Sequence, residues 1–258
     1  MSSRTETSPT VSLITGGSRG LGRAAALALA ARGADSIITY RDREADAAQV
    51  VADVEAAGAR AVALRLDAAD SSSFGAFAER VKAVLASTWL RAQFDHLVNN
   101  AGFGVHRPLA ETTEAEFDEL FRVHVKAPYF LTQKLLPLIA DGGRVLNVST
   151  GLTRFALPGY SAYASMKGGV EVMTRYMARE FGARGIAVNA IAPGATATDF
   201  GGGAVRDNAQ LNAMVASSVA LGRVGLADDI GAVISNLLRP ENAWVTGQRI
   251  EASGGQAL

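Results

Sequence analysis

The chain has 258 residues and a mass of 26.8 kDa, and its 25 Lys and Arg residues are balanced by 25 Asp and Glu residues. This balance gives no basic excess that would indicate binding to nucleic acid or an anionic membrane. The absence of cysteine excludes disulfides and thiolate metal sites, and no apolar run reaches the ~18 residues of a spanning helix. We expect a cytoplasmic protein with no metal, a flexible N-terminus over residues 1–9 and one domain over residues 10–258.

The first predicted unit is a buried strand over residues 10–15, a glycine-rich turn and an Ala- and Leu-rich helix over residues 23–32. Glycines let the backbone approach a phosphate closely, and a helix N-terminus attracts its negative charge. The alternative is an ordinary turn between a strand and a helix. The candidate phosphate-binding residues are Gly16, Ser18, Arg19, Gly20, Leu21 and Gly22.

The end of the second predicted strand, residues 36–40, bears on the choice of cofactor. A carboxylate at this point would bind the ribose hydroxyls of NAD, but this chain has Tyr40 followed by Arg41. Arg41 and Arg19 could hold a 2′-phosphate, because a guanidinium matches phosphate oxygens. The pattern therefore favours NADP(H), with solvated arginines as the alternative.

Asp67 follows the third predicted strand, residues 60–66, which comes after a helix over residues 44–57. It could contact an adenine amine, or it could cap the next helix, predicted over residues 71–86. Residues 87–93 are expected to be a connection without regular structure.

The fourth predicted strand, residues 94–98, ends in Asn99-Asn100-Ala101-Gly102, a turn that can present donors and acceptors beside a ligand. Thr113 and Glu116 then form a capping box that opens a long helix. The apolar face of this helix is expected to comprise Phe117, Leu120, Phe121 and position 124, by their helical spacing.

His124 occupies position 124 and should therefore face inward. Pro128, four residues later, has no N–H to donate to the carbonyl of His124. We expect an irregular helix here, with a carbonyl that must find another donor or a water.

Tyr163 and Lys167 lie four residues apart in a predicted helix over residues 160–182, so one face of that helix carries a phenol and an ammonium. A neighbouring cation favours the phenolate and lowers the pKa of a tyrosine. This helix follows a fifth strand, residues 144–148, and the residues Ser149 and Thr150. A solvated lysine on a surface helix is the alternative.

A sixth strand over residues 186–191 leads to Pro193, Gly194, Thr196 and Thr198, and a polar, glycine-rich flap is expected over residues 199–218. A helix over residues 227–238 and a strand over residues 248–251 complete the chain. This alternation predicts an α/β fold, a doubly wound, Rossmann-like parallel sheet of about seven strands. The carboxyl ends of the strands would then carry residues 16–22, Asp67, residues 99–102, Ser149, Thr150 and residues 193–198.

Four motifs occur in order: Thr15-Gly16-x-x-x-Gly20-x-Gly22, Asn99-Asn100-Ala101-Gly102, Tyr163-x-x-x-Lys167 and Pro193-Gly194. A hydroxyl residue, Thr150, lies thirteen positions before the tyrosine. In this combination the chain resembles the short-chain dehydrogenase/reductase family over residues 10–255, and is most similar to NADP-preferring members such as 3-oxoacyl carrier-protein reductases.

The resemblance implies hydride transfer between NADP(H) and a small-molecule carbonyl or secondary alcohol. It implies that Tyr163 is the general acid, that Lys167 lowers its pKa and holds the nicotinamide ribose, and that a hydroxyl binds the substrate oxygen. The family has serine at that position, whereas this chain offers Thr150 or Ser149. The cofactor residues that follow are Tyr40, Arg41, Asp67, Asn100, Ala101, Gly102, Tyr163, Lys167, Pro193, Gly194, Thr196 and Thr198.

The family also has an asparagine where this chain has His124. The resemblance implies that the main-chain carbonyl of this asparagine holds a water connected to the lysine. In this chain Pro128 would keep the corresponding carbonyl, that of His124, free for the same water.

A non-catalytic NADP(H)-binding regulatory protein of the same fold is the alternative function. The resemblance implies a homotetramer built on helices around residues 111–140 and 160–182. The flap and five further residues are expected to shape an apolar pocket: Phe103, His106, Phe155, Leu157 and Tyr160.

Overall fold

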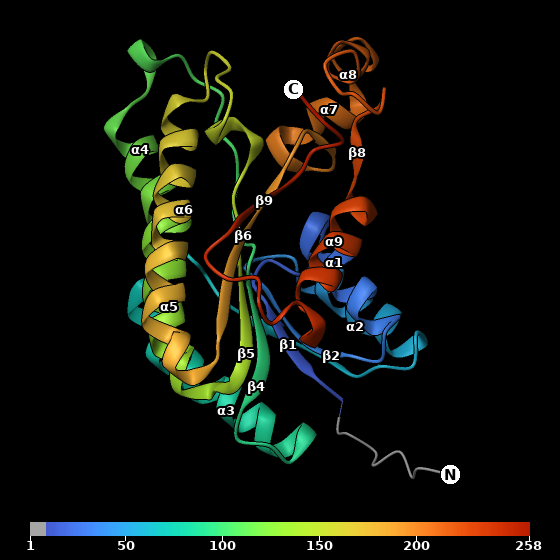
Figure 1. The fold of residues 1–258 in the computed structure, drawn as a ribbon, viewed down its shortest axis with the longest axis vertical. Coiled ribbons are helices and arrows are strands. Elements are labelled where there is room, and N and C mark those ends of the chain that lie inside the picture. The colour runs from blue at the N-terminus through green and yellow to red at the C-terminus, as the bar shows by residue number, and fades with distance from the viewer. Residues whose placement is uncertain (1–8) are drawn as a thin grey trace.

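The computed structural model describes residues 9–258, so the expectation of a flexible terminus concerns residues outside the described part, apart from Pro9. Seven parallel strands form one sheet in the order β3-β2-β1-β4-β5-β6-β9 (Figure 1). The order reverses between β1 and β4, the switch point at which open α/β sheets bind ligands. The predicted doubly wound fold is therefore confirmed. The strands are β1 (Val11–Ile14), β2 (Asp35–Tyr40), β3 (Ala61–Arg65), β4 (Phe94–Asn99), β5 (Ile139–Val148), β6 (Ala187–Pro193) and β9 (Arg249–Ala252).

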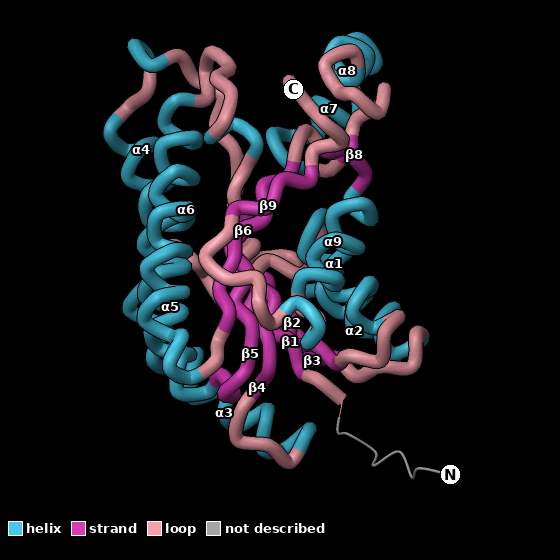
Figure 2. Tube along the Cα trace, viewed as in Figure 1, coloured by secondary structure: helices cyan, strands magenta, loops and turns pink. Residues whose placement is uncertain are grey.

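Two helical layers cover the sheet, as Figures 1 and 2 show. One layer contains α3 (Phe74–Trp89), α5 (Ala127–Leu135) and α6 (Ser161–Phe181), and the other α1 (Gly20–Ala30), α2 (Glu44–Ala56) and α9 (Ala227–Leu237). Neighbouring residues of one strand face opposite layers: Leu13 packs into the first apolar core and Ile14 into the second. Such strands are apolar on both faces, which explains their continuous apolar runs. No helix within residues 9–258 is long and apolar enough to cross a membrane.

The segment expected to be an irregular flap contains two helices, α7 (Ala204–Asp207) and α8 (Ala209–Ala216). They lie beyond the carboxyl ends of the strands (Figure 1). The side chain of Asn208 accepts a hydrogen bond from Leu211 N and caps α8, which the expectation of a flap overlooked. Two short strands, β7 (Thr196–Ala197) and β8 (Gly225–Leu226), form a separate parallel pair on either side of these helices.

Two further expectations need correction. Helix α3 continues through Trp89 and ends at Leu90 in a left-handed conformation, so residues 87–89 are helical. Trp89 extends the helix because its indole is buried and donates to Asp35 Oδ2 at 2.6 Å. In α4 (Glu114–Phe121) the capping box of Thr113 and Glu116 is present as predicted. Leu120 is buried, but Phe117 and Phe121 are 45% and 44% exposed, because the apolar face extends around to the outer surface.

Candidate active site

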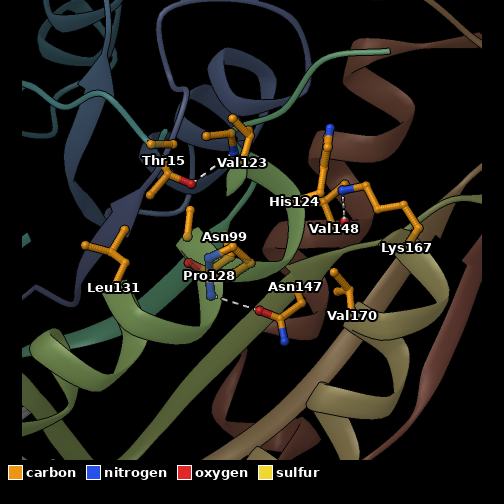
Figure 3. Close-up of a pocket in the computed structure, with 13 residues that line it drawn as sticks. Thr15, Asn99, Val123, His124, Pro128, Leu131, Asn147, Val148, Lys167 and Val170 are labelled. Carbon is orange, nitrogen blue, oxygen red and sulfur yellow. Dashed lines mark hydrogen bonds between the residues drawn. The ribbon is translucent and has the colours of Figure 1, made fainter. Parts of the chain in front are cut away.

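Tyr163 and Lys167 lie in the first turns of α6 and are both buried, with 5% of each residue exposed. Lys167 Nζ lies 5.8 Å from the centre of the Tyr163 ring. The same nitrogen donates to the carbonyl oxygen of Val148, at the end of β5, at 2.7 Å (Figure 3). The helix therefore brings the phenol and the amine together at the carboxyl edge of the sheet, as their spacing predicts.

Burial moves the pKa values of the two groups in opposite directions. It raises the pKa of Tyr163, and it lowers the pKa of Lys167 to about 7. A hydrogen bond with Thr150 lowers the pKa of Tyr163, but less than burial raises it. The expectation that the pKa of Tyr163 is lowered is not met in this structure, because burial of the phenol outweighs its polar neighbours. Lys167, whose own pKa is lowered to about 7, carries its charge about half of the time at neutral pH.

Thr150 and Ser149 face different surroundings, although they are adjacent. Thr150 lies against Tyr163, and its hydroxyl accepts a hydrogen bond from Leu152 N at 3.3 Å. Ser149 instead donates to Glu171 Oε1 at 2.7 Å. Of the two candidates, the structure brings only Thr150 beside the phenol.

His124 is buried, as its spacing predicts, with 2% of the residue exposed. Its Nε2 lies 2.8 Å from the carbonyl oxygen of Phe103, so Nε2 carries the proton and Nδ1 is an acceptor. Nδ1 has no hydrogen-bond partner among residues 9–258. Burial and the nearby Lys167 hold the pKa of His124 well below its usual value. The imidazole packs edge-on against Tyr163 with ring centres 5.3 Å apart, so a neutral ring borders the phenol.

The helix around His124 is irregular, as Pro128 predicts. Residues Arg122–Lys126 form a π-helical turn, in which the N–H of Ala127 donates to the carbonyl of Arg122, five residues back. Beside this turn lies a cavity of about 20 Å³, room for about one water. Figure 3 shows His124, Pro128 and Lys167 among the residues around it. Asn99 Oδ1, also in its lining, has no partner within the described residues.

The glycine turn, residues 16–22, has the geometry of a phosphate cradle. Gly16 and Gly20 have φ of +65° and +53°, and a Cβ on Gly22 would lie 2.4 Å from the carbonyl oxygen of Gly16. Arg19 precedes α1 without capping it, and no side chain among residues 9–258 bonds the first N–H groups of that helix. Free N–H groups at a helix N-terminus bind anions. Ser18 is half-buried, and Leu21 packs its side chain against the second core.

Asn99 ends β4, and the side-chain amide of Asn100, the next residue, bonds to the protein's own backbone. Asn100 Nδ2 donates to the carbonyls of Thr15 and Gly16 at 2.8 and 3.1 Å. Thr15 Oγ1 accepts from the N–H groups of Asn100 and Ala101 at 2.9 and 3.0 Å. These bonds hold the glycine turn against residues 100–101. Gly102 adjoins the imidazole, since a Cβ there would lie 2.6 Å from His124 Cε1.

The residues expected at the adenosine end lie beside the glycine turn. Thr39 accepts hydrogen bonds from Gly16 N and Gly17 N, so the end of β2 abuts the turn, and Tyr40 is half-buried there. Arg41 is exposed and pairs with Asp42 at 2.6 Å. Arg19 pairs with Asp199 at 3.2 Å.

Asp67 is exposed, and its carboxylate accepts a hydrogen bond from Ala69 N at 2.8 Å. The capping alternative for Asp67 is wrong, because Asp70 caps the helical turn before α3 through Ser72 N.

The segment after β6 also lies at the carboxyl edge of the sheet. Gly194 packs against the C-terminal segment, where a Cβ would lie 2.8 Å from Ser253. Pro193 ends β6, and Thr196 and Thr198 bond to backbone groups of their own segment. Phe200, which the sequence did not single out, lies 5.7 Å from Tyr163 between ring centres. Its ring also contacts Gly104, so an aromatic side chain covers the phenol. No local pattern marks this long-range contact.

Of the residues expected to shape the pocket, the structure relates two directly to Tyr163. Phe103 and Tyr160 pack against a small apolar cluster that contains Tyr163. His106 stacks edge-on against Tyr160 with ring centres 5.0 Å apart. Phe155 lies over Gly151, and Leu157 is 47% exposed at the surface. Aromatic rings of Phe103, Tyr160 and Phe200 thus lie near Tyr163.

Comparisons with known proteins find similarity to reductases. Residues 16–257 match the family described as enoyl-(acyl carrier protein) reductase. A hydroxynaphthalene reductase-like protein, Arp2 of Metarhizium brunneum, is 34% identical over 260 residues, covering 95% of this chain and 94% of the relative.

Two solved structures are also similar. One is the promiscuous reductase LugOII, which catalyses keto-reduction at C1 during lugdunomycin biosynthesis (TM-score 0.92, 38% identity, 96% and 98% coverage of this and that chain). The other is the landomycin C-6 ketoreductase LanV with bound NADP and rabelomycin (TM-score 0.87, 34% identity, 96% coverage of both chains). These likenesses span almost the whole chain.

Proposed function

The chain belongs to the short-chain dehydrogenase/reductase family, and we propose that it is an NADPH-dependent ketoreductase. The observation that carries the proposal is the buried group of Tyr163, Lys167 and Thr150 at the carboxyl edge of the sheet. The adjoining glycine turn fits a dinucleotide, because it has close backbone approach and free helical N–H groups.

The proposed chemistry divides between cofactor and protein. When bound, NADPH supplies the hydride to the substrate carbonyl carbon. Thr150 donates a hydrogen bond to the carbonyl oxygen and orients it, and Tyr163 protonates that oxygen as charge develops there. Lys167, with a pKa near 7, is suited to return a proton to the tyrosine at neutral pH. The cavity beside the π-helical turn has room for the water through which that proton would arrive.

For the cofactor we propose NADP(H) rather than NAD(H). The end of β2 carries no carboxylate at position 40, and Arg41 and Arg19 lie exposed at the glycine turn. Both arginines pair with carboxylates of their own chain, which a 2′-phosphate would displace. The binding of NADP by the ketoreductase LanV supports this choice.

For the substrate we propose a fused-ring aromatic ketone. Aromatic side chains lie near Tyr163, and aromatic rings favour stacked or edge-on contacts with other rings. The likeness to a hydroxynaphthalene reductase-like protein and to the landomycin C-6 ketoreductase LanV, which was solved with bound rabelomycin, supports an aromatic polyketide-like substrate.

The test is NADPH oxidation with a panel of tetralones, naphthols in their keto form, angucyclinones and simple aliphatic ketones. We expect turnover with the fused-ring ketones and little with short aliphatic ones. NADPH binding without turnover on any carbonyl would favour the alternative, a non-catalytic NADP(H)-binding protein of the same fold.

We also propose that residues 10–258 act as one domain and assemble as a homotetramer. The outer surfaces of α4, α5 and α6 expose large apolar side chains that a partner copy could cover. These are Phe117, Phe121, Tyr129, Phe130, Val172 and Tyr176. Light scattering at micromolar concentration should give four times the chain mass, and a 26.8 kDa species alone would contradict the proposal.

A further inference from the structure

Four alternating charges join α6, the segment after β5 and the edge strand β9: Glu171, Arg249, Glu251 and Arg154. Arg249 Nε lies 2.8 Å from Glu171, and its Nη1 lies 2.9 Å from Glu251. Arg154 forms two bonds to Glu251, at 2.7 and 2.8 Å. The side chains of Glu171, Arg249 and Glu251 are less than a quarter exposed. No local sequence pattern marks this charge chain, because its members lie far apart in the sequence.

The charge chain holds the backbone on both sides of Thr150. Ser149 and Thr153 both donate to Glu171 Oε1 at 2.7 Å. Arg249 Nη2 donates to the carbonyl oxygen of Thr150 itself at 3.2 Å. The residue before Thr150, its own peptide group and the end of the following turn are thus all fixed to the pair formed by Glu171 and Arg249.

This attachment determines where the Thr150 hydroxyl points. A threonine side chain has two heavy atoms on Cβ and is stiff about χ1. The position of its Oγ1 therefore follows the backbone, and a backbone shift would move the hydroxyl away from Tyr163. Displacing a reacting group by about 1 Å can cost on the order of 10²-fold in rate.

We propose that Arg249 is a positioning residue of the reductase, which holds the Thr150 hydroxyl against Tyr163 through the Thr150 peptide and through Glu171. This inference rests on the proposed function. This positioning role differs from a purely stabilising one, and a second ion pair in the chain serves as the control for stabilisation alone. Arg91 and Asp95 form a bidentate pair of similar exposure, 23% and 21%, which binds Val11 and Pro9 at the N-terminal end of β1.

The first experiment compares Arg249→Gln and Arg249→Lys with Arg91→Gln. Lysine keeps the charge but lacks the planar fork that reaches Glu171, Glu251 and the Thr150 carbonyl together. We expect Arg249→Gln to lower kcat by about tenfold or more, and Arg249→Lys by less. The NADPH Kd should stay within about twofold in both. Arg91→Gln should lower Tm at least as much and leave kcat unchanged. Equal kcat in parent and both Arg249 variants would overturn the proposal.

The second experiment is a double-mutant cycle with Thr150→Val, which keeps the shape and removes the hydroxyl. If Arg249 acts through Thr150, adding Arg249→Gln to Thr150→Val should cost no further kcat. A full, multiplicative further loss would show that Arg249 acts elsewhere and would overturn the proposal.

A crystal structure of Arg249→Gln gives a readout independent of turnover, and we expect Thr150 Oγ1 to have moved away from Tyr163. An unmoved Thr150 would also refute the inference. Failure of the parent to turn over any ketone would instead count against the proposed function, and the position of Thr150 would still test the role of Arg249.

Discussion

At the glycine turn, the side chains of Thr15 and Asn100 are bonded to the backbone, whereas around Tyr163 several titratable groups are buried together. Thr15 and Asn100 hold the turn through four hydrogen bonds, so these two side chains shape the turn and do not themselves bind a ligand. In the catalytic cluster of Thr150, Tyr163, Lys167 and His124, burial alters three pKa values strongly, and His124 Nδ1 has no partner within residues 9–258. The first region is suited to binding and the second to chemistry.

The variant with the largest expected effect distinguishes catalysis from cofactor binding. Tyr163→Phe removes the proton donor and little volume, so turnover should fall by at least the ~10²-fold typical of losing a general acid. NADPH affinity should persist, because the glycine turn is untouched. Steady-state kinetics and NADPH fluorescence measure the two quantities. Tyr176→Phe, an exposed tyrosine on the same helix, is the control. Near-parental turnover of Tyr163→Phe would remove Tyr163 from its role.

A second variant tests the binding region alone. A charged hydrogen bond contributes about 1.5–3 kcal/mol, so Arg41→Ala should weaken NADPH by about tenfold or more and barely affect NADH. Arg43→Ala, which removes another exposed arginine paired within its own chain, serves as the control. Titrations with both cofactors measure the effect. Equal losses for NADPH and NADH would mean that Arg41 does not read the 2′-phosphate.

The same contrast explains what the sequence could predict. The glycine turn, the capping box and the π-helical turn at Pro128 depend on residues a few positions apart, and local pattern was enough to find them. The choice between Ser149 and Thr150 was not local. Thr150 is extended, with φ −159° and ψ 155°, so its neighbour points to the other side. Which one meets Tyr163 depends on how α6 packs against β5.

The extent to which Lys167 is buried could not be predicted from the sequence either. Spacing placed Lys167 beside Tyr163 correctly, but the effect of its charge depends on how much water reaches it. The partners of Glu171 and of Phe200 likewise lie far away along the chain, and no periodicity marks them.

The lowered pKa of Lys167 predicts a pH dependence of stability. Unfolded lysine stays protonated up to its usual pKa of 10.5, whereas the buried amine loses its proton above about pH 7. Between these values unfolding takes up a proton, so stability should rise with pH, by up to about 1.4 kcal/mol per unit. Below pH 7 both states are protonated, and the full cost of burying the charge remains.

The measurement is urea unfolding of the cofactor-free protein at pH 7 and pH 9. Lys167→Met should abolish this part of the pH dependence, and Lys134→Met, an exposed lysine on α5, should retain it. A parental dependence in Lys167→Met would mean that the amine titrates normally in the folded protein.

The π-helical turn offers a finer test inside the catalytic cluster. Pro128→Ala restores an N–H that can donate to the carbonyl of His124 and lets the helix close. If that carbonyl holds a water on the way to Lys167, turnover should fall several-fold more than NADPH affinity does. A variant that folds normally and turns over like the parent would contradict the role of the free carbonyl.

The smallest effect is expected for His124→Asn. The imidazole donates to the Phe103 carbonyl at 2.8 Å, and an asparagine amide carries a donor that can make the same bond. The proline still keeps the helix irregular, so turnover should change only a few-fold and NADPH affinity hardly at all. His124→Leu is the contrast, because it leaves the Phe103 carbonyl without this donor and should lower turnover more. A rise by orders of magnitude in His124→Asn would instead show that the histidine inactivates the site. The non-catalytic alternative would then gain its strongest support, because the neutral ring beside Tyr163 would be the feature that stops turnover.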